Sequence, residues 1–148
     1  MRQARDVYHI GDSYALAMYC AGVAVECLLR AFRWHKDPSF EGRHDLEDLL
    51  KSSDLLRIHD DHMRRKGVSE EQVIDYAIRL RAAMNEVIVL WHNSLRYASE
   101  ASLRAFLKRI DRLHGIRGDA LKKNALDLLN AAQTVLDRGV AVWTSKKK

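Results

Sequence analysis

The stretch YCAGVAVECLLRAF, Tyr19–Phe32, decides the fold that we expect for this chain. Its single acid, Glu26, is surrounded by small and apolar residues, and Arg30 follows four residues later. On a helix this spacing brings the two charges together on one face. In apolar surroundings each charge needs the other, because an unpaired buried charge is strongly destabilising. We therefore predict a buried helix in which Glu26 is a polar anchor that holds Arg30 or Arg96; the alternatives are an exposed residue on a narrow polar strip and a general base.

The rest of the chain has the same helical character. Apolar residues recur at three- and four-residue spacing throughout, no alternating strand pattern is present, and Pro38 is the only proline. We predict an all-α, up-and-down bundle of about five to six helices with short connections. The 148 residues suit one domain, with a core over about residues 8–143 and a basic tail at 144–148.

Capping residues and glycines indicate where the expected helices begin and end. Asp45, Ser69 and Asp119 are suitable N-caps, while Gly115 and Gly139 are suitable stops. The expected helices cover about residues 6–34, 45–52, 54–67, 69–93, 103–115 and 119–139.

The first expected helix is apolar on more than one face. One stripe follows three- and four-residue spacing along it and consists of Leu16, Cys20, Val23, Cys27, Ala31 and Trp34. Neighbouring helices could cover this helix, and a second subunit could cover part of it, so we expect a homodimer. The two cysteines lie about 10 Å apart along a helix, beyond the reach of a disulfide, and are expected to be free thiols and small core residues.

The apolar stretch from Tyr14 to Phe32 raises the question of a membrane span. Glu26 and Arg30 within it would each cost about 3 kcal/mol at the bilayer centre, so we expect no membrane association. The first ten residues, MRQARDVYHI, have neither the apolar core nor the cleavage site of a signal peptide. We therefore expect a cytoplasmic protein.

The positive charge is concentrated in one segment. The net charge of the chain is +5, and residues 104–123 hold seven bases against two acids. Such a segment either attracts phosphate or forms the solvated face of a surface helix.

Two other groups of polar residues are candidates for a site. Arg96 beside Tyr97, at a helix end, suits phosphate recognition; alternatively, Arg96 pairs with Glu26 and Tyr97 packs. His59 and His62 have the spacing of metal ligands, but no third ligand accompanies them, so we predict a solvated polar turn, no metal and no cofactor.

Three patches together resemble the HEPN family of prokaryotic helical domains. They are AGVAVECLLRAF, with Ala24, Glu26, Leu29 and Arg30; HDLEDLLK, with His44, Asp45 and Leu46; and LRYAS, with Arg96 and Tyr97. The resemblance implies a dimeric helical bundle, often encoded beside a nucleotidyltransferase. It also implies a polar cluster in which His44 lies near the Glu26 anchor.

Many HEPN proteins are metal-independent toxin ribonucleases that use an arginine and, four to six residues on, a histidine. No histidine follows Arg96 at that distance here. The same spacing does occur at Arg30/His35, Arg57/His62 and Arg109/His114. Arg109 and His114 lie in the basic segment and are the best catalytic candidates of the three pairs.

Three functions follow from these observations. The first is a dimeric binding module for a nucleotide or RNA, partnered with a nucleotidyltransferase in a toxin–antitoxin-type system, whose ligand would contact Arg96, Tyr97, Glu26, Arg30 and His44. The second is a metal-independent ribonuclease that uses Arg109 and His114. The third is a structural interaction domain without a ligand.

Overall fold

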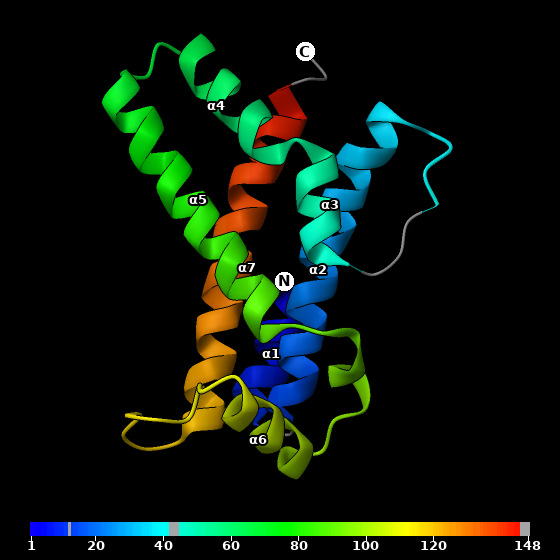
Figure 1. The fold of residues 1–148 in the computed structure, drawn as a ribbon, viewed down its shortest axis with the longest axis vertical. Coiled ribbons are helices and arrows are strands. Elements are labelled where there is room, and N and C mark those ends of the chain that lie inside the picture. The colour runs from blue at the N-terminus through cyan, green and yellow to red at the C-terminus, as the bar shows by residue number, and fades with distance from the viewer. Residues whose placement is uncertain (12, 42–44, 146–148) are drawn as a thin grey trace.

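The computed structural model describes residues 1–11, 13–41 and 45–145, and these residues form an all-α bundle without strands (Figure 1). Helices account for 80% of the structure, which confirms the predicted fold class. The elements are α1 (Arg2–Ile10), α2 (Tyr14–Lys36), α3 (Leu46–Ser53), α4 (Leu55–Arg65), α5 (Glu70–Leu90), the 3-10 helix η1 (Asn93–Tyr97), α6 (Glu100–Arg109) and α7 (Ala120–Ser145).

The three long helices form the centre of the bundle. Helix α7 packs along both α2 and α5 and lies between them in Figure 1. The shorter elements cover this centre: α1, α3 and η1 pack on α2, and α4 packs on α5 and α7. The long helices are therefore flanked by short elements from different parts of the sequence.

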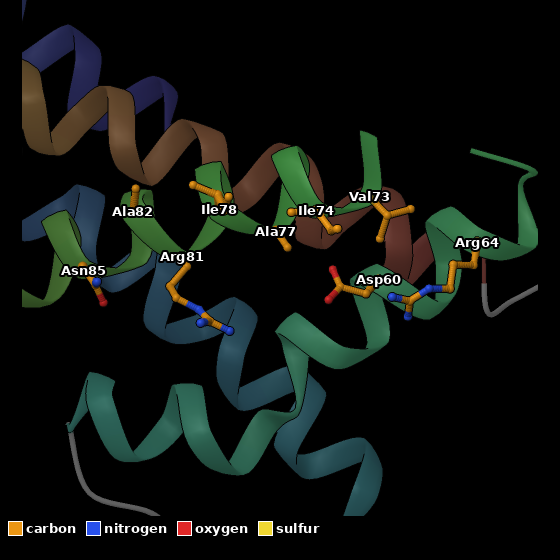
Figure 2. Close-up of a pocket in the computed structure, with 9 residues that line it drawn as sticks. All are labelled: Asp60, Arg64, Val73, Ile74, Ala77, Ile78, Arg81, Ala82 and Asn85. Atoms are coloured by element: carbon orange, nitrogen blue, oxygen red, sulfur yellow. The ribbon is translucent and has the colours of Figure 1, made fainter. Parts of the chain in front are cut away.

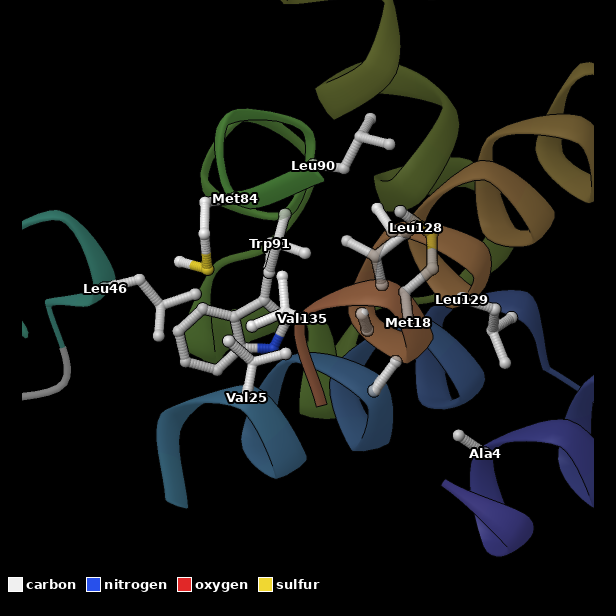
Figure 3. Close-up of a cluster of buried hydrophobic side chains, with 14 of the residues drawn as sticks. Ala4, Met18, Val25, Leu46, Met84, Leu90, Trp91, Leu128, Leu129 and Val135 are labelled. Carbon is white, nitrogen blue, oxygen red and sulfur yellow. The ribbon is translucent and has the colours of Figure 1, made fainter. Parts of the chain in front are cut away.

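The core side of α2 is lined by Met18, Ala21, Val25 and Leu29, each of which has no exposed surface. Figure 3 shows Met18 and Val25 beside Leu128, Leu129 and Val135 of α7, together with Trp91. These α2 residues recur at three- and four-residue spacing, so one continuous stripe meets α7. Burial of this stripe joins the first and last helices of the chain.

The stripe that contains the cysteines lies on the opposite, less buried side of α2. Cys27 is exposed and Cys20 is half-buried, so the prediction of two core residues is wrong for Cys27. Both cysteines are free, as predicted. Burial of Cys20 raises the pKa of its thiol.

The first predicted helix is two helices. Helix α1 begins at Arg2 rather than Asp6 and ends at Gly11, which has a left-handed φ of 78°. Helix α2 then begins after Ser13, whose hydroxyl accepts a hydrogen bond from the Leu16 amide at 3.2 Å. Glycine adopts this φ without a steric penalty, and the serine cap restarts the helix.

The three predicted N-caps are confirmed. Asp45 accepts from two amides of α3, Ser69 accepts from the Gln72 amide of α5, and Asp119 accepts from two amides at the start of α7. These bonds satisfy amides that have no partner within their own helix.

The predicted C-terminal ends are less accurate. Helix α6 ends at Arg109, before Gly115, and α7 continues through Gly139 to Ser145. A Cβ atom at Gly139 would lie 2.3 Å from Cδ2 of Leu28. This glycine therefore allows α2 and α7 to approach closely instead of ending the helix.

His59 and His62 are buried, so the prediction of a solvated turn is wrong. Their exposed fractions are 1% and 7%, because both lie on the inner face of α4. Nδ1 of His62 is 3.1 Å from the Ser145 hydroxyl of α7. Burial lowers the pKa of His62, and Lys66, Arg65 and His59 lower it further, so the imidazole is neutral at pH 7.

Candidate functional site

The Glu26–Arg30 pair exists and is internal. Glu26 is 4% exposed, and Oε1 accepts a hydrogen bond from Nε of Arg30 at 2.6 Å. The exposed-strip alternative is therefore wrong, and Glu26 is an anchor within the bundle. Arg30 remains about one-third exposed. The predicted partner His44 lies outside the described residues.

A pocket of about 630 Å³ lies between η1 and α6. Its lining consists of His92, Ser94, Leu95, Tyr97, Ala98, Ser102, Ala105, Phe106 and Arg109. Every residue of this lining comes from one continuous segment that follows α5. We call it the η1–α6 pocket.

Trp91 fixes the place where this segment leaves the bundle. Its backbone is extended and ends α5, while its indole Nε1 donates to the Tyr19 carbonyl of α2 at 3.1 Å. Gly22 of α2 makes room for the indole, since a Cβ there would lie 2.0 Å from Cδ1 of Trp91. The position of the pocket therefore depends on α2.

His92, the next residue, forms one wall of the pocket. Its ring meets the ring of Phe106 edge-on, with centroids 4.4 Å apart. Nδ1 of His92 is hydrogen-bonded to the Ser94 hydroxyl. Nε2 is buried and has no hydrogen-bond partner among the described residues. Burial, and then the charge of Arg109, lower the pKa of His92, so the ring is neutral at pH 7.

Two arginines meet aromatic rings at this pocket. The guanidinium of Arg109 lies over Phe106, 5.7 Å from the ring centroid. That of Arg96 lies over Tyr97 at 5.1 Å, and Tyr97 is 79% exposed. The alternative in which Arg96 pairs with Glu26 and Tyr97 packs is therefore not what the structure has. Neither arginine forms an ion pair with any described residue.

The basic segment is partly neutralised. Arg104 pairs with Glu100, Lys123 pairs with Asp127, and Arg112 pairs with Glu86 of α5. Four bases of the segment have no ion pair within the described part of the chain: Lys108, Arg109, Arg117 and Lys122. Arg109 is the one of these four that lines the pocket.

The predicted site residues therefore separate into groups. Tyr97 and Arg109 share the pocket, with Arg96 stacked on Tyr97. His114 is exposed and does not line it, so the candidate pair Arg109/His114 is not assembled there. His92 lines it instead. His92 lies in the segment WHNSLRY, four residues before Arg96, but the sequence alone offers no reason to prefer it over the other histidines.

A second groove, of about 430 Å³, lies between α4 and α5 (Figure 2). Its apolar wall comes from α5 and includes Val73, Ile74 and Ile78. Asp60 and Arg81 point into the open space from opposite helices. The groove has no aromatic lining and no histidine. It therefore lacks the features that make the η1–α6 pocket a candidate site for binding a nucleobase and a phosphate.

Within the described ranges, no group of three or more His, Cys, Asp or Glu side chains is placed to hold a metal ion. Helix α2 is the one described helix that is long and apolar enough to cross a membrane, and 56% of its most apolar window is buried in the bundle, as core helices also are.

No family model, curated protein sequence or solved structure matches the chain. The HEPN resemblance therefore stays a prediction that rests on the three sequence patches. Any functional conclusion has to come from the geometry described above.

Proposed function

We propose that this chain is a HEPN-like binding module whose η1–α6 pocket takes single-stranded RNA. The observation that carries the proposal is an exposed aromatic ring beside arginines that form no ion pair with any described residue. Tyr97 is 79% exposed, Arg96 lies on its ring, and Arg109 contributes a further charge without an ion pair among the described residues.

Stacking and charge are the two interactions that single-stranded RNA offers to a protein. Unstacked bases pack on aromatic and guanidinium planes, and phosphates are attracted to arginine. The ring of Tyr97 is 79% exposed, so a nucleobase can reach it and stack on it. The Ser94 and Ser102 hydroxyls in the lining add hydrogen-bonding groups for a ribose or a base edge.

The hydrogen bonding and burial of His92 favour binding over catalysis. Its Nδ1 is bonded to Ser94, and its Nε2 is buried. A general base has to come within hydrogen-bond distance of the proton that it removes. Nε2 can do so only if the groups that bury it move.

Metal-independent RNA cleavage is the second candidate function, and one observation favours it. A neutral imidazole and an arginine line one pocket, and the pKa of His92 is lowered in part by Arg109. A neutral histidine accepts a proton, while an arginine stabilises the charge on a phosphate. Here His92 would replace His114 as the base.

The further expectations from the resemblance belong to this proposal. A nucleotidyltransferase partner and a role in a toxin–antitoxin-type system are consistent with an RNA-binding module. A free nucleotide presents the same base and phosphate, so it is the natural competitor in a binding assay. The structural-domain alternative requires that the pocket bind neither.

The test is fluorescence anisotropy with a labelled single-stranded RNA, without divalent metal, at about 50 and 200 mM salt. We expect Tyr97→Ala and Arg109→Ala each to weaken binding roughly tenfold, since one stacked base contributes about 1–3 kcal/mol. Lys122→Ala removes the same charge as Arg109→Ala from outside the pocket and should change the affinity little. Of the two pocket variants, Arg109→Ala should lower the salt dependence of binding and Tyr97→Ala should leave it unchanged.

The other outcomes are equally informative. Equal effects of Arg109→Ala and Lys122→Ala would indicate unspecific attraction and contradict the proposal. Cleavage of the RNA that is lost in His92→Ala would establish the second candidate. Absence of binding to RNA and to a competing nucleotide at low salt would leave the structural domain.

A further inference from the structure

Helix α2 carries an apolar stripe on the side that faces away from the core. We call it the α2 stripe, and it consists of Leu16, Cys20, Val23, Cys27, Ala31 and Trp34. Trp34 is 58% exposed, Leu16 is 38% exposed, and none of the six residues is buried. The stripe contains no charged residue and extends for about 27 Å along the helix. A continuous apolar surface of this kind indicates an interaction site.

The spacing of the stripe is that of a helix–helix interface. Its residues follow one another at intervals of three or four, as the contact positions of paired helices do. The bundle uses the opposite side of α2 for its core. Cys20 and Val23 are partly covered at the edge of the core, while Leu16, Cys27 and Trp34 are the exposed members of the α2 stripe.

The side-chain sizes of the stripe are complementary when two copies of α2 are placed antiparallel to each other. The point midway between Val23 and Ala24 is also midway between Cys20 and Cys27, and midway between Leu16 and Ala31. A twofold axis at that point places the large Leu16 against the small Ala31 of a second copy. Large residues opposite small ones let two helices interdigitate.

We propose that the α2 stripe is the interface of a homodimer in which α2 packs antiparallel on α2 of a second copy. The antiparallel arrangement places the positive N-terminal end of each helix beside the negative C-terminal end of the other, which is electrostatically favourable. A twofold interface is self-complementary, as this stripe is.

The ends of the helix support the same register. Trp34 is as far from the axis as Ser13, which directly follows the turn after Ile10. Ile10 is 68% exposed and Trp34 is 58% exposed. The dimer therefore places the exposed Trp34 of each copy at the N-terminal end of α2 of the other copy.

A second copy fits the stripe better than a charged partner does. The α4–α5 groove is bordered by Asp60, Arg64 and Arg81, whose charges a partner has to match. Arg30 borders the α2 stripe, but its guanidinium is bonded to the buried Glu26, so the stripe offers a partner mainly the shape of its apolar side chains. The inference identifies the interface of the homodimer that the proposed HEPN-like function implies, and it rests on the proposed function in this respect alone. RNA takes no part in its test.

The cysteines provide the decisive experiment. In the antiparallel dimer Cys20 faces Cys27 of the other copy, so a short bis-maleimide should join two chains, one thiol adding to each maleimide. Cys20→Ser and Cys27→Ser should each abolish the cross-linked dimer on a denaturing gel. An equal mixture of the two variants should restore about half of it, because half of the dimers are then mixed. A cross-link that persists in either single variant would overturn the antiparallel register.

Sedimentation measures the association itself. We expect the wild type at twice the 17.0 kDa chain mass, without RNA. Val23→Arg places two like charges at the axis and should weaken dimerisation at least about tenfold. Val89→Arg, on the exposed side of α5, is the matched control and should stay dimeric.

Folding is controlled by a second variant and by circular dichroism. Trp34→Glu changes a side chain that is 58% exposed, so the monomer should keep its helicity while the dimer weakens. A monomeric wild type, or equal weakening by Val23→Arg and Val89→Arg, would overturn the inference. So would a monomer that binds lipid vesicles through the stripe. Loss of RNA binding in an intact dimer would instead contradict only the RNA-binding proposal.

Discussion

Replacement of Gly22 by alanine tests whether α2 sets the position of the η1–α6 pocket. The new Cβ would lie 2.0 Å from Cδ1 and 2.2 Å from Nε1 of Trp91. Real Cβ atoms do not approach other atoms so closely, so the indole has to move. Because Trp91 is 6% exposed and surrounded by core residues, it cannot move without disturbing them.

The expected cost follows from three contributions. Overpacking a core costs about 1–3 kcal/mol. Displacement of the indole weakens its hydrogen bond to the Tyr19 carbonyl, a loss of about 1 kcal/mol. Alanine in a helix is favoured over glycine by about 0.5–1 kcal/mol, which offsets part of this. The net expectation is a loss of about 2 kcal/mol, or roughly 4–8 °C in Tm for a chain of this size.

The assay is urea denaturation followed by far-UV circular dichroism, in a double-mutant cycle with Trp91→Leu. Once the indole is absent, Gly22→Ala should become neutral or stabilising by about 0.5–1 kcal/mol, because only the helix preference remains. The same loss of stability in both backgrounds would refute the reasoning. We also expect Gly22→Ala to weaken RNA binding, since His92 directly follows Trp91.

Three further predictions concern stability. The lowered pKa values of His62 and His92 mean that the unfolded chain binds more protons below about pH 6.5, so the free energy of unfolding should fall as the pH drops through that range, and Tm measured at several pH values checks this. Arg30→Met removes the 2.6 Å contact to buried Glu26 and should lower the free energy of unfolding, measured by urea denaturation, by about 2 kcal/mol. This is less than for a fully buried pair, because Arg30 is partly exposed. Adding Glu26→Gln should recover part of the lost stability. Asp45→Ala removes the N-cap of α3 and should cost about 1 kcal/mol, measured in the same way.

Each of these predictions has a contradicting result. A Tm that rises on acidification would show that the two histidines are not held neutral by burial. Equal stability of Arg30→Met and the wild type would show that the carboxylate of Glu26 does not need the guanidinium. Asp45→Ala without effect would mean that the α3 amides find other acceptors.

Local features were predicted well because their causes lie within a few residues of one another. The caps Asp45, Ser69 and Asp119 each bond amides two or three residues away. The Glu26–Arg30 pair needs only one turn of helix. For the same reason, the all-α class followed from spacing and composition alone.

The candidate site was predicted in part. Arg96 and Tyr97 were selected because an arginine beside an aromatic at a helix end suits a phosphate, and they lie together in the structure. Arg109 was selected together with His114, which does not line the pocket. The ring contact between His92 and Phe106 joins residues on either side of the turn between η1 and α6, and the sequence does not state how that turn folds back.

By itself, the sequence determined the helices, their N-caps and the internal charge pair, because these depend on interactions between near neighbours in the chain. The tertiary structure alone decided which stripe of α2 meets α7 and which stays uncovered. It also decided that His59 and His62 are buried, and that Gly22 and Gly139 are contact points where other helices or side chains come close. Burial depends on which surfaces cover one another, and a residue's own neighbours in sequence do not determine that.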